Sequence, residues 1–279
     1  MHHNIYHLNS FDGTQLFVQL WQPSQKPLAV ICLVHGIGEH SSRYHHWAEK
    51  FVKHDYAVIG FDQRGHGLSS GKRGVISSYQ DFLNDIDLIL AESEKHFNNT
   101  PSILYGHSMG GGEVLNHLLT RKSNYLGVIS TSPWIRAQAV PPKIAIPFIR
   151  VLNKIIPSFS LETKFDSDLL SHDAEIVRRY NEDDLVHYKI SFRLFMDAYD
   201  KGYEILQNTN KIKKPLLLLH GSDDKITDPL ASKTFSENNK EYCTFKMWDG
   251  GYHELHHEPF KDDVFAAILS WIEEIRQKK

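Results

Sequence analysis

Residues 102–122 read SILYGHSMGGGEVLNHLLTRK, and this stretch determines the expected fold. The apolar run 102–105 is typical of a buried strand, and 111–122 has the apolar spacing of a helix. Between them, residues 106–110 match the pattern G-x-S-x-G. A serine in such a strand-to-helix turn is exposed at the end of its strand, and the glycines let strand and helix approach closely. We therefore predict that Ser108 is a nucleophile.

Short apolar runs alternate with amphipathic stretches along most of the chain, which predicts a mostly parallel sheet with helices on both faces. The strands are expected at 27–36, 56–62, 101–108, 125–132, 215–221 and 242–248. The helices are expected at 44–55, 78–97, 111–122, 228–239 and 259–277. The period-2 pattern of 14–21 predicts an additional antiparallel strand at the edge of the sheet.

One long segment departs from this alternation. Between about residues 133 and 204 no buried strand is evident, and helical patterns are interrupted by Pro141, Pro142, Pro147 and Pro157. We predict that residues 133–205 form a helical cap, inserted into a core made of residues 1–132 and 206–279.

A serine hydroxyl is a weak nucleophile and needs an adjacent base that a carboxylate orients. In sites built on a strand–turn–helix serine, an acid and then a histidine follow along the chain. Residues 216–228 (LLLLHGSDDKITD) bring carboxylates just past a predicted strand. Asp223, Asp224 and Asp228 are all candidates for the acid, and spacing does not separate the first two.

Residues 250–259 (GGYHELHHEP) contain the candidate bases. His253 comes first after the flexible glycine pair, where a loop can carry its ring over the edge of the sheet. His256 and His257 lie nearer to Pro259, which suits the first turn of the last helix. We therefore predict His253 as the base.

The same stretch matches H-E-x-x-H, which binds zinc in metalloproteases when one helix carries both histidines on one face. Two glycines precede the pattern and Pro259 follows it, so a helix across 253–257 would be barely one turn long. No third ligand is evident. We therefore predict no metal and no cofactor, and a zinc peptidase that a chelator would inactivate is kept as an alternative.

Two backbone N–H groups are expected to stabilise the negative charge that forms on a substrate oxygen. Met109 provides one, at the start of the helix after the nucleophile. Residues 35–38 (HGIG) follow an earlier predicted strand, where the second donor of such sites is found. Ile37 is the expected second donor.

Five stretches together resemble the monoglyceride lipase and lysophospholipase family of α/β-hydrolases. They are HGIGEHSSRY (35–44), FDQRGHGLSSGKRG (61–74), GHSMGG (106–111), GSDD (221–224) and GGYHELHHE (250–258). The similarity runs from the first strands to the last helix. It implies the α/β-hydrolase fold, with a mostly parallel sheet, helices on both faces and an inserted helical cap. We interpret DQRGHG as a structural turn against the sheet.

The resemblance also selects among the candidate residues. The family's acid is the last residue of G-S-x-D, which is Asp224 here, and its base follows an aromatic residue, which makes it His253. The family's oxyanion donors correspond to Ile37 and Met109. A cysteine that some animal members carry shortly after the acid is Thr227 here, so thiol-directed inhibition at this position should be absent.

The segment 143–157 (KIAIPFIRVLNKIIP) carries Lys143, Arg150 and Lys154 on one helical stripe, with apolar residues around much of the remaining circumference. Pro147 is expected to limit the helix to its later part. One interpretation is a lid that lines an acyl pocket and touches lipid, and the other is a helix packed on the core with a solvated basic edge. The candidate substrate-binding residues of the cap are Ile144, Phe148, Val151 and Leu152.

The leading hypothesis is a serine ester hydrolase that cleaves monoacylglycerols to fatty acid and glycerol through an acyl-enzyme. A lysophospholipase and a short-chain carboxylesterase are alternatives, because the sequence does not specify acyl length or headgroup. A non-catalytic ligand receptor on the same fold is a further alternative, which only a turnover assay excludes.

The composition is ordinary for a soluble globular protein of 279 residues, with 41% hydrophobic and 23% charged residues. A net charge of −3 gives no reason to expect nucleic acid as a partner. The two cysteines do not suggest disulfides, and no stretch approaches the roughly 18 apolar residues of a membrane-spanning helix. We expect a cytoplasmic protein that binds a small lipid or ester substrate and contacts membranes peripherally through its cap. The sequence does not indicate the oligomeric state.

Overall fold

The computed structural model describes residues 1–163, 165–208 and 211–278. Its central eight-stranded sheet has the strand order β1-β2-β4-β3-β5-β6-β9-β10. The part from β4 to β10 is parallel, whereas β2 pairs antiparallel with both β1 and β4. The bounds are β1 (His2–Asn9), β2 (Gln15–Gln22), β3 (Val30–Val34), β4 (Ala57–Phe61), β5 (Ser102–His107), β6 (Val128–Thr131), β9 (Leu216–Gly221) and β10 (Cys243–Trp248). The predicted mostly parallel sheet is confirmed.

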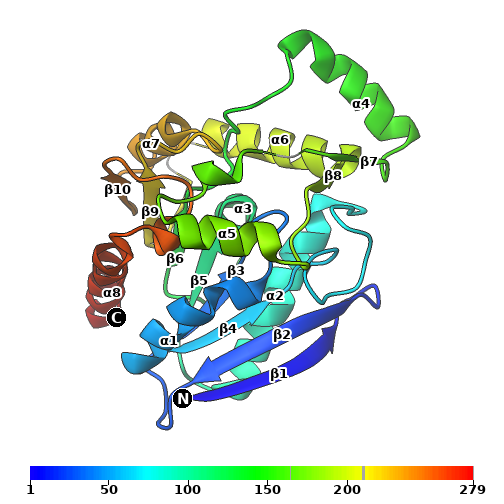
Figure 1. Cartoon of the computed structure of the whole chain (residues 1–279). Coiled ribbons are helices and arrows are strands. Elements are labelled where there is room, and N and C mark those ends of the chain that lie inside the picture. The colour runs from blue at the N-terminus through cyan, green and yellow to red at the C-terminus, as the bar shows by residue number, and fades with distance from the viewer. Residues whose placement is uncertain (164, 209–210, 279) are drawn as a thin grey trace.

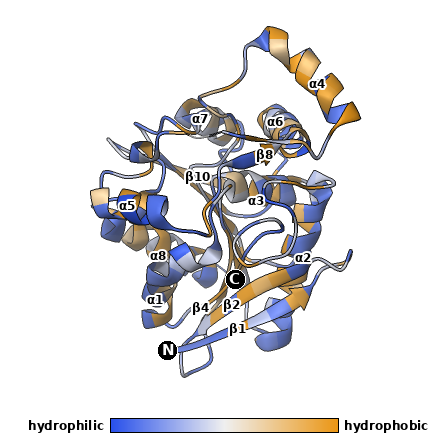
Figure 2. Cartoon of the chain, turned by 45° about the vertical axis from the view of Figure 1, so that its right-hand side comes forward, coloured by the Kyte–Doolittle hydropathy of each residue, from blue (hydrophilic) through white to orange (hydrophobic). Residues whose placement is uncertain are grey.

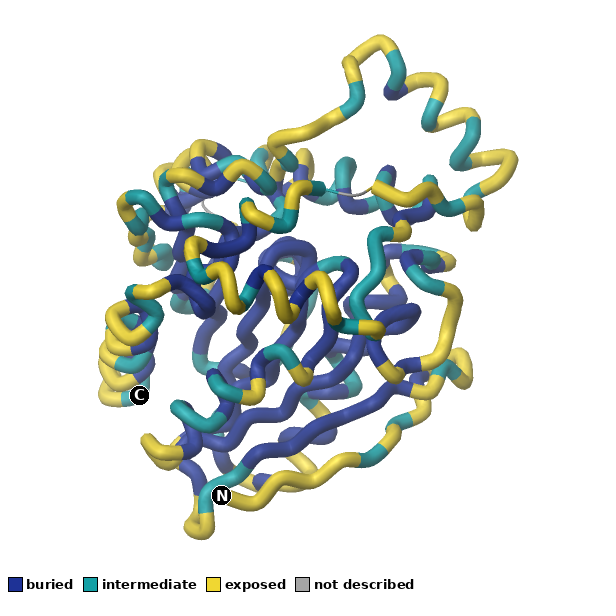
Figure 3. Tube along the Cα trace, viewed as in Figure 1, coloured by how far each residue is buried: buried dark blue, intermediate teal, exposed yellow. Residues whose placement is uncertain are grey.

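Helices cover both faces of this sheet (Figure 1). On one face the core contains side chains of α2 (Tyr79–His96), α3 (Met109–Thr120) and α7 (Pro229–Glu237). On the other face it contains side chains of α1 (His45–Lys53) and α8 (Lys261–Gln277). The strands between the two layers are buried along most of their length (Figure 3), as continuous apolar runs require.

The edge strand β1 was not predicted. In its sequence HHNIYHLN only Tyr6 and Leu8 are partly buried and the other side chains are exposed, so the alternation that reveals a strand is weak. The predicted antiparallel strand at 14–21 corresponds to β2, which lies one position inside the edge.

The register of the sheet brings the loops of interest together. Val34, at the end of β3, pairs with Gly106 of β5, and Trp248 of β10 pairs with Gly221 of β9. Because these strands are parallel, the loops that follow them all leave the sheet at the carboxyl ends of the strands.

The segment between β6 and β9 contains the predicted cap. Its elements are η2 (Lys143–Ala145), α4 (Ile146–Ile155), β7 (Ser160–Glu162), η3 (Ser167–Leu169), α5 (Ala174–Glu182), β8 (Lys189–Ser191) and α6 (Phe192–Gln207). The antiparallel pair β7–β8 was not predicted, because strands of three residues are too short to show a period. The α6 helix extends two residues beyond the predicted boundary at 205. The predicted domains include positions 164, 209, 210 and 279, which lie outside the described residues, and the division into core and cap stays a prediction.

The α4 helix stands away from the sheet and packs on α6 (Figure 1). Pro147 lies in its first turn, so the α-helix begins at Ile146, as expected. Hydrophobic residues predominate along it in Figure 2, and side chains such as Phe148 remain 65% exposed. Among the helices in the described part of the chain, neither α4 nor any other combines the length and apolar composition needed to cross a membrane.

The DQRGHG loop is tied to its surroundings by buried charges. The Asp62 carboxylate accepts hydrogen bonds from the backbone N–H groups of Ser41 (2.8 Å) and Leu68 (2.7 Å). Arg64 donates from two nitrogens to Asp85 in α2, at 2.7 and 2.9 Å. These contacts support the structural interpretation of this loop.

Glu113 in α3 is fully buried, and neither carboxylate oxygen has a hydrogen-bond partner among the described residues. Burial is the main reason that the pKa of Glu113 lies well above its ordinary value, and the charge of Asp85 raises it further. The folded chain therefore keeps this carboxyl protonated at pH values at which the unfolded chain ionises. Stability is consequently lost as the pH rises above the unfolded pKa.

We expect Glu113→Gln to raise the free energy of unfolding at about pH 8 and to change it little at about pH 5. The unfolded glutamate ionises above about pH 4.3, and each further pH unit destabilises the wild type by up to about 1.4 kcal/mol until the folded pKa is reached. Denaturant unfolding at several pH values measures the effect. The control is Glu237→Gln at an exposed position of α7. A stability difference between the Glu113→Gln variant and the wild type that did not change with pH would contradict the prediction.

Candidate active site

Ser108 lies in the turn between β5 and α3, with φ +55° and ψ −117°. This left-handed backbone is rarely adopted by residues with a side chain. The flanking glycines are sterically required, because a Cβ on Gly106 would lie 2.3 Å from the Gly110 carbonyl oxygen. A Cβ on Gly110 would lie 2.4 Å from the carbonyl oxygen of His35. The predicted strand–turn–helix arrangement is therefore present.

The structure brings the predicted nucleophile, base and acid together. His253 Nε2 lies 2.9 Å from Ser108 Oγ, and His253 Nδ1 lies 2.8 Å from Asp224 Oδ2. All three residues are buried. They follow β5, β10 and β9, whose C-terminal ends meet at one edge of the sheet.

The rival carboxylates are placed elsewhere. Asp228 caps α7, where it accepts a hydrogen bond from Leu230 N–H (2.8 Å), and it pairs with Arg136. Asp223 is exposed and accepts a hydrogen bond from the hydroxyl of its neighbour Ser222. Asp224 is thus the carboxylate that reaches His253.

Opposing electrostatic effects set the protonation of this pair. Burial lowers the pKa of His253, but the charge of Asp224 and its hydrogen bond more than compensate, and the net pKa is raised. Burial likewise raises the pKa of Asp224, but His253 and the hydrogen bond from His220 bring the net value well below the ordinary range. The carboxylate stays ionised, and His253 is a stronger base than an isolated histidine.

Two further side chains that were not predicted hold Asp224. His220 lies with Nε2 3.1 Å from Asp224 Oδ2 and with Nδ1 2.8 Å from the hydroxyl of Ser232. The hydroxyl of Thr227 lies 2.9 Å from the same Oδ2. The other carboxylate oxygen accepts from the backbone N–H groups of Ile226 and Thr227. The sequence signal for His220 is a single polar residue in the apolar strand LLLLHG.

The predicted oxyanion donors border the nucleophile. A Cβ on Gly36 would lie 3.0 Å from Ser108 Cβ, so the loop carrying Ile37 lies directly against the serine. Ile37 also lines the cavity at Ser108 and His253. Met109 is the first residue of α3, where N–H groups have no partner inside the helix. The roles of Ile37 and Met109 stay predictions.

A buried ion cluster connects the loop after β3 to the loop after β10. Glu39 accepts hydrogen bonds from Gly36 N–H (2.6 Å) and from the Tyr44 hydroxyl (2.8 Å). Arg43 donates to Glu39 (2.6 Å) and, from two nitrogens, to Glu254 (2.6 and 2.8 Å). The three charged side chains are at most 8% exposed. All three lie inside the stretches that carry the family resemblance, but the sequence does not predict their contacts.

The H-E-x-x-H stretch forms no α-helix in the structure, which describes all of its residues. His253 points to Ser108, and the helical element within the stretch is the three-residue 3-10 turn η4 (Leu255–His257). His257 Nδ1 lies 2.6 Å from Glu254. The geometry expected from the glycines and Pro259 is therefore observed, and the two histidines of the zinc pattern have different partners.

The cavity at Ser108 has a volume of about 70 Å³. The segment predicted as the cap contributes Phe165, Leu170 and Tyr180 to its wall. None of these was predicted, because two lie in irregular stretches and Tyr180 lies on a polar helix.

The predicted cap residues do not line this cavity in the structure. The α4 helix packs on α6 and leaves much of its apolar side exposed. Ile144 is 89% exposed. The four predicted residues Ile144, Phe148, Val151 and Leu152 are absent from the wall of the cavity at Ser108.

We expect a fluorophosphonate probe to form an adduct with Ser108, because His253 can take the hydroxyl proton as the phosphorus–oxygen bond forms and fluoride leaves. Ser108→Ala and His253→Gln should abolish the adduct, and the control Asp223→Asn should leave it unchanged. Since only the neutral imidazole accepts the proton, the rate should fall as the pH drops through the raised pKa of His253, above its ordinary value of about 6.5. Peptide mass spectrometry locates the adduct, and labelling that is independent of His253 would contradict the prediction.

The comparisons with known proteins agree with this geometry. Residues 25–260 match the family model described as serine aminopeptidase, S33. The monoglyceride lipase of Homo sapiens is 33% identical over 277 residues, which cover 95% of this chain and 89% of that protein. The crystal structure of Paleococcus ferrophilus monoacylglycerol lipase is 34% identical and superposes with a TM-score of 0.85, covering 93% of this chain and 99% of that one.

An abhydrolase domain-containing protein of Dictyostelium discoideum is 36% identical over 274 residues, and the chain spans 29% of its length. The relatives from Homo sapiens and Paleococcus ferrophilus, in contrast, are matched over most of their length. On its sheet topology, its sequence and these matches, the chain belongs to the monoglyceride lipase family of α/β-hydrolases, within the group described as serine aminopeptidase, S33.

Proposed function

We propose that the chain is a serine ester hydrolase that cleaves monoacylglycerols into a fatty acid and glycerol. The hydrogen-bonded chain from Ser108 through His253 to Asp224 is the observation that carries this proposal. The monoglyceride lipases among the relatives support the class of substrate.

In the first step, Ser108 Oγ attacks the ester carbonyl carbon while His253 Nε2 takes the hydroxyl proton. The ionised Asp224 stabilises the imidazolium that forms. The N–H groups of Ile37 and Met109 donate to the oxygen that becomes negative. The bond to the glycerol oxygen then breaks, His253 returns the proton to that oxygen, and glycerol leaves an acyl-enzyme on Ser108.

In the second step, a water molecule replaces glycerol. His253 removes a proton from the water as its oxygen attacks the acyl carbon. The new tetrahedral intermediate collapses, the bond to Ser108 Oγ breaks, and His253 protonates the serine. The fatty acid is released and the starting state is restored.

The cavity at Ser108 is too small for this substrate as it stands. Its volume of about 70 Å³ is well below the roughly 300 Å³ or more of typical ligand pockets. The side chains that close it from the cap are Phe165, Leu170 and Tyr180. We infer that the cap moves away from the core when substrate binds.

The walls of the cavity favour a neutral headgroup. Its polar side contains Arg43, Glu39 and Glu254. The guanidinium of Arg43 pairs with both carboxylates, so these three side chains together carry a net negative charge. A phosphate placed there would be repelled at low dielectric, whereas hydroxyl groups can donate to the carboxylates. This charge balance favours a monoacylglycerol over a lysophospholipid.

We expect turnover of 1-monoacylglycerols that is greatest for medium or long acyl chains and slower for lysophosphatidic acid of the same chain. Ser108→Ala should reduce the rate by about 10³-fold or more, and a chelator should not lower the rate of the wild type. The release of fatty acid measures the substrate preference, the loss of rate in Ser108→Ala and the response to the chelator. Activity on the shortest esters alone would indicate a carboxylesterase, and activity that survived Ser108→Ala but not the chelator would indicate a metal-dependent enzyme.

We further propose that the outer face of the cap contacts lipid surfaces. Ile144, Phe148 and Ile155 are 89%, 65% and 71% exposed, an unusual density of large apolar side chains on one short segment. Lys154 lies on the same helix and can meet anionic headgroups.

We expect the double variant Phe148→Ser, Ile155→Ser to bind lipid vesicles more weakly and to turn over vesicle-borne monoacylglycerol more slowly. Hydrolysis of a water-soluble short ester should be unchanged, because these side chains do not line the cavity at Ser108. Vesicle sedimentation and fatty acid release measure the two effects. The matched control is Leu230→Ser, which removes a side chain of α7 that is 63% exposed. Equal loss in the control would contradict a specific role for the cap.

A further inference from the structure

The H-E-x-x-H stretch contains a second grouping of side chains. Glu254, His256 and His257 each offer one ligand atom, and these atoms lie within 4.8 Å of one another. All three residues are buried. This set differs from the pair His253 and His257 that the zinc pattern would use, and it needs no α-helix, because two of its members lie in η4.

His256 lacks the partners that a buried polar ring normally has. Both of its ring nitrogens are buried, and neither has a hydrogen-bond partner among the described residues. Its ring stacks on Tyr44, with centroids 4.6 Å apart, and contacts His107 at 4.9 Å. An unpartnered buried imidazole is costly in free energy, and a metal ion is a partner that a ring nitrogen binds directly.

The charge of the surroundings favours a cation. Glu39 and Glu254 share the guanidinium of Arg43, so these three buried side chains carry one uncompensated negative charge. Arg43 occupies one acceptor site on each oxygen of Glu254, and His257 Nδ1 lies 2.6 Å from Oε2. A carboxylate has about four acceptor sites, so a site on Oε1 remains and Arg43 does not have to leave.

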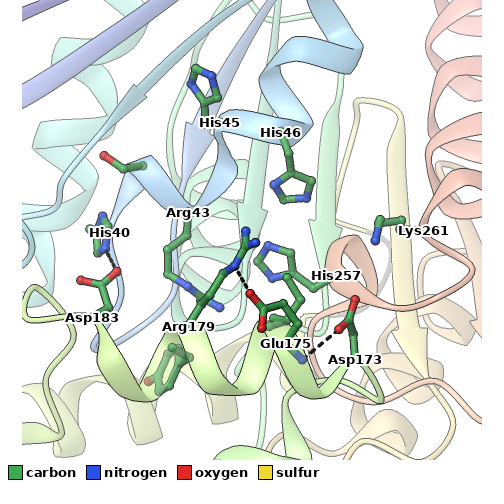
Figure 4. A pocket seen from close by; sticks show the side chains of 13 residues that line it. His40, Arg43, His45, His46, Asp173, Glu175, Arg179, Asp183, His257 and Lys261 are labelled. Atoms are coloured by element: carbon green, nitrogen blue, oxygen red, sulfur yellow. Dashed lines mark hydrogen bonds and ion pairs between the residues drawn. The ribbon is translucent and has the colours of Figure 1, made fainter.

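A cavity of about 590 Å³ reaches one member of the cluster, His257, from outside (Figure 4). We call it the outer cavity, and its walls include Arg43, His46 and His257. The rings of His46 and His257 are stacked with centroids 4.7 Å apart. Arg179 on the opposite wall is 70% exposed, so the outer cavity reaches solvent.

We propose that Glu254, His256 and His257 bind one divalent transition metal ion of the Zn²⁺ class, which enters through the outer cavity. Two imidazoles and one carboxylate are a ligand set that zinc takes when a water occupies the fourth position. With bonds of about 2.1 Å, tetrahedral ligand atoms lie about 3.4 Å apart, so no pair of the present ligand atoms has to close in by more than about 1.4 Å on binding.

The bound ion would inhibit hydrolysis. The ring of His107 contacts both His253 (4.8 Å) and His256 (4.9 Å), which places the ion one ring away from the base. A divalent cation there disfavours the positive charge that His253 acquires when it takes the proton of Ser108. This consequence rests on the proposed function, whereas metal binding does not.

Isothermal titration of the full chain with Zn²⁺ tests the site without reference to activity. We expect one tight equivalent, weakened at least about tenfold by His256→Gln and by His257→Gln. His45→Gln, which changes another histidine of the outer cavity wall, should bind as the wild type does. Circular dichroism checks that the variants are folded. The visible spectrum of Co²⁺ added to the wild type reports nitrogen and oxygen ligation independently of any variant.

Two results overturn the proposal. One is a wild type that binds no tight equivalent of Zn²⁺. The other is a tight equivalent that survives both His256→Gln and His257→Gln, since the metal would then bind adventitiously to surface histidines. Measuring ester hydrolysis with and without Zn²⁺ separates the proposed metal site from the proposed hydrolase function. Zinc inhibition that is relieved by His257→Gln supports both the metal site and the hydrolase function. Zinc binding to a chain that hydrolyses no ester overturns the proposed function and leaves the metal site standing. Hydrolysis that is unaffected by saturating Zn²⁺ overturns the inhibitory role.

Discussion

The left-handed backbone at Ser108 is the constraint on which the site depends. A side chain at φ +55° is strained, and it is held there because β5 runs straight into α3 with glycines where a Cβ would collide with backbone oxygen atoms. The collision partner of Gly110 is the end of β3, so the same close approach that permits the turn brings the loop of Ile37 against Ser108. Nucleophile and oxyanion loop are therefore positioned by one packing contact.

Buried charge holds the remaining loops. The Asp224 carboxylate is surrounded by donors from its own loop and from His220. The guanidinium of Arg43 connects its near neighbour Glu39 to Glu254, which lies 211 positions from Arg43 in the sequence. Removing one partner of such a pair leaves an unpaired buried charge, which typically costs about 3–5 kcal/mol. His253 lies beside Glu254 and in contact with Asp224, so its loop is tied on both sides and its ring has little freedom to leave Ser108.

The sequence predicts the parts of this arrangement that depend on local pattern. The parallel strands and their helices are predictable to within a few residues, because buried strands are continuous apolar runs and a serine elbow has a short, ordered motif. Spacing alone does not separate Asp223 from Asp224, since both follow the same strand; the family resemblance selects Asp224, and the structure shows that it reaches His253.

What the sequence could not predict depends on contacts between distant segments. The pairing of Arg43 with Glu254 joins two loops that have no pattern in common, and Phe165 reaches the cavity from an irregular stretch. The α4 helix shows the limit of periodicity most clearly. Its apolar arc is visible in the sequence, but periodicity describes a face and says nothing of what covers that face, and here the face is left exposed.

The stretch from His253 to His257 shows why spacing acquires a chemical meaning only with a backbone. On an α-helix, residues four apart share a face, and the pattern would form a zinc ligand pair. Here the chain makes a loop and then a 3-10 turn with about three residues per turn, so successive side chains diverge widely. His253 faces the nucleophile, Glu254 faces Arg43, and His257 faces the outer cavity. Because this backbone is a loop and a 3-10 turn in place of an α-helix, the residues of the H-E-x-x-H stretch provide a catalytic base, an ion-pair partner for Arg43 and a different group of candidate metal ligands.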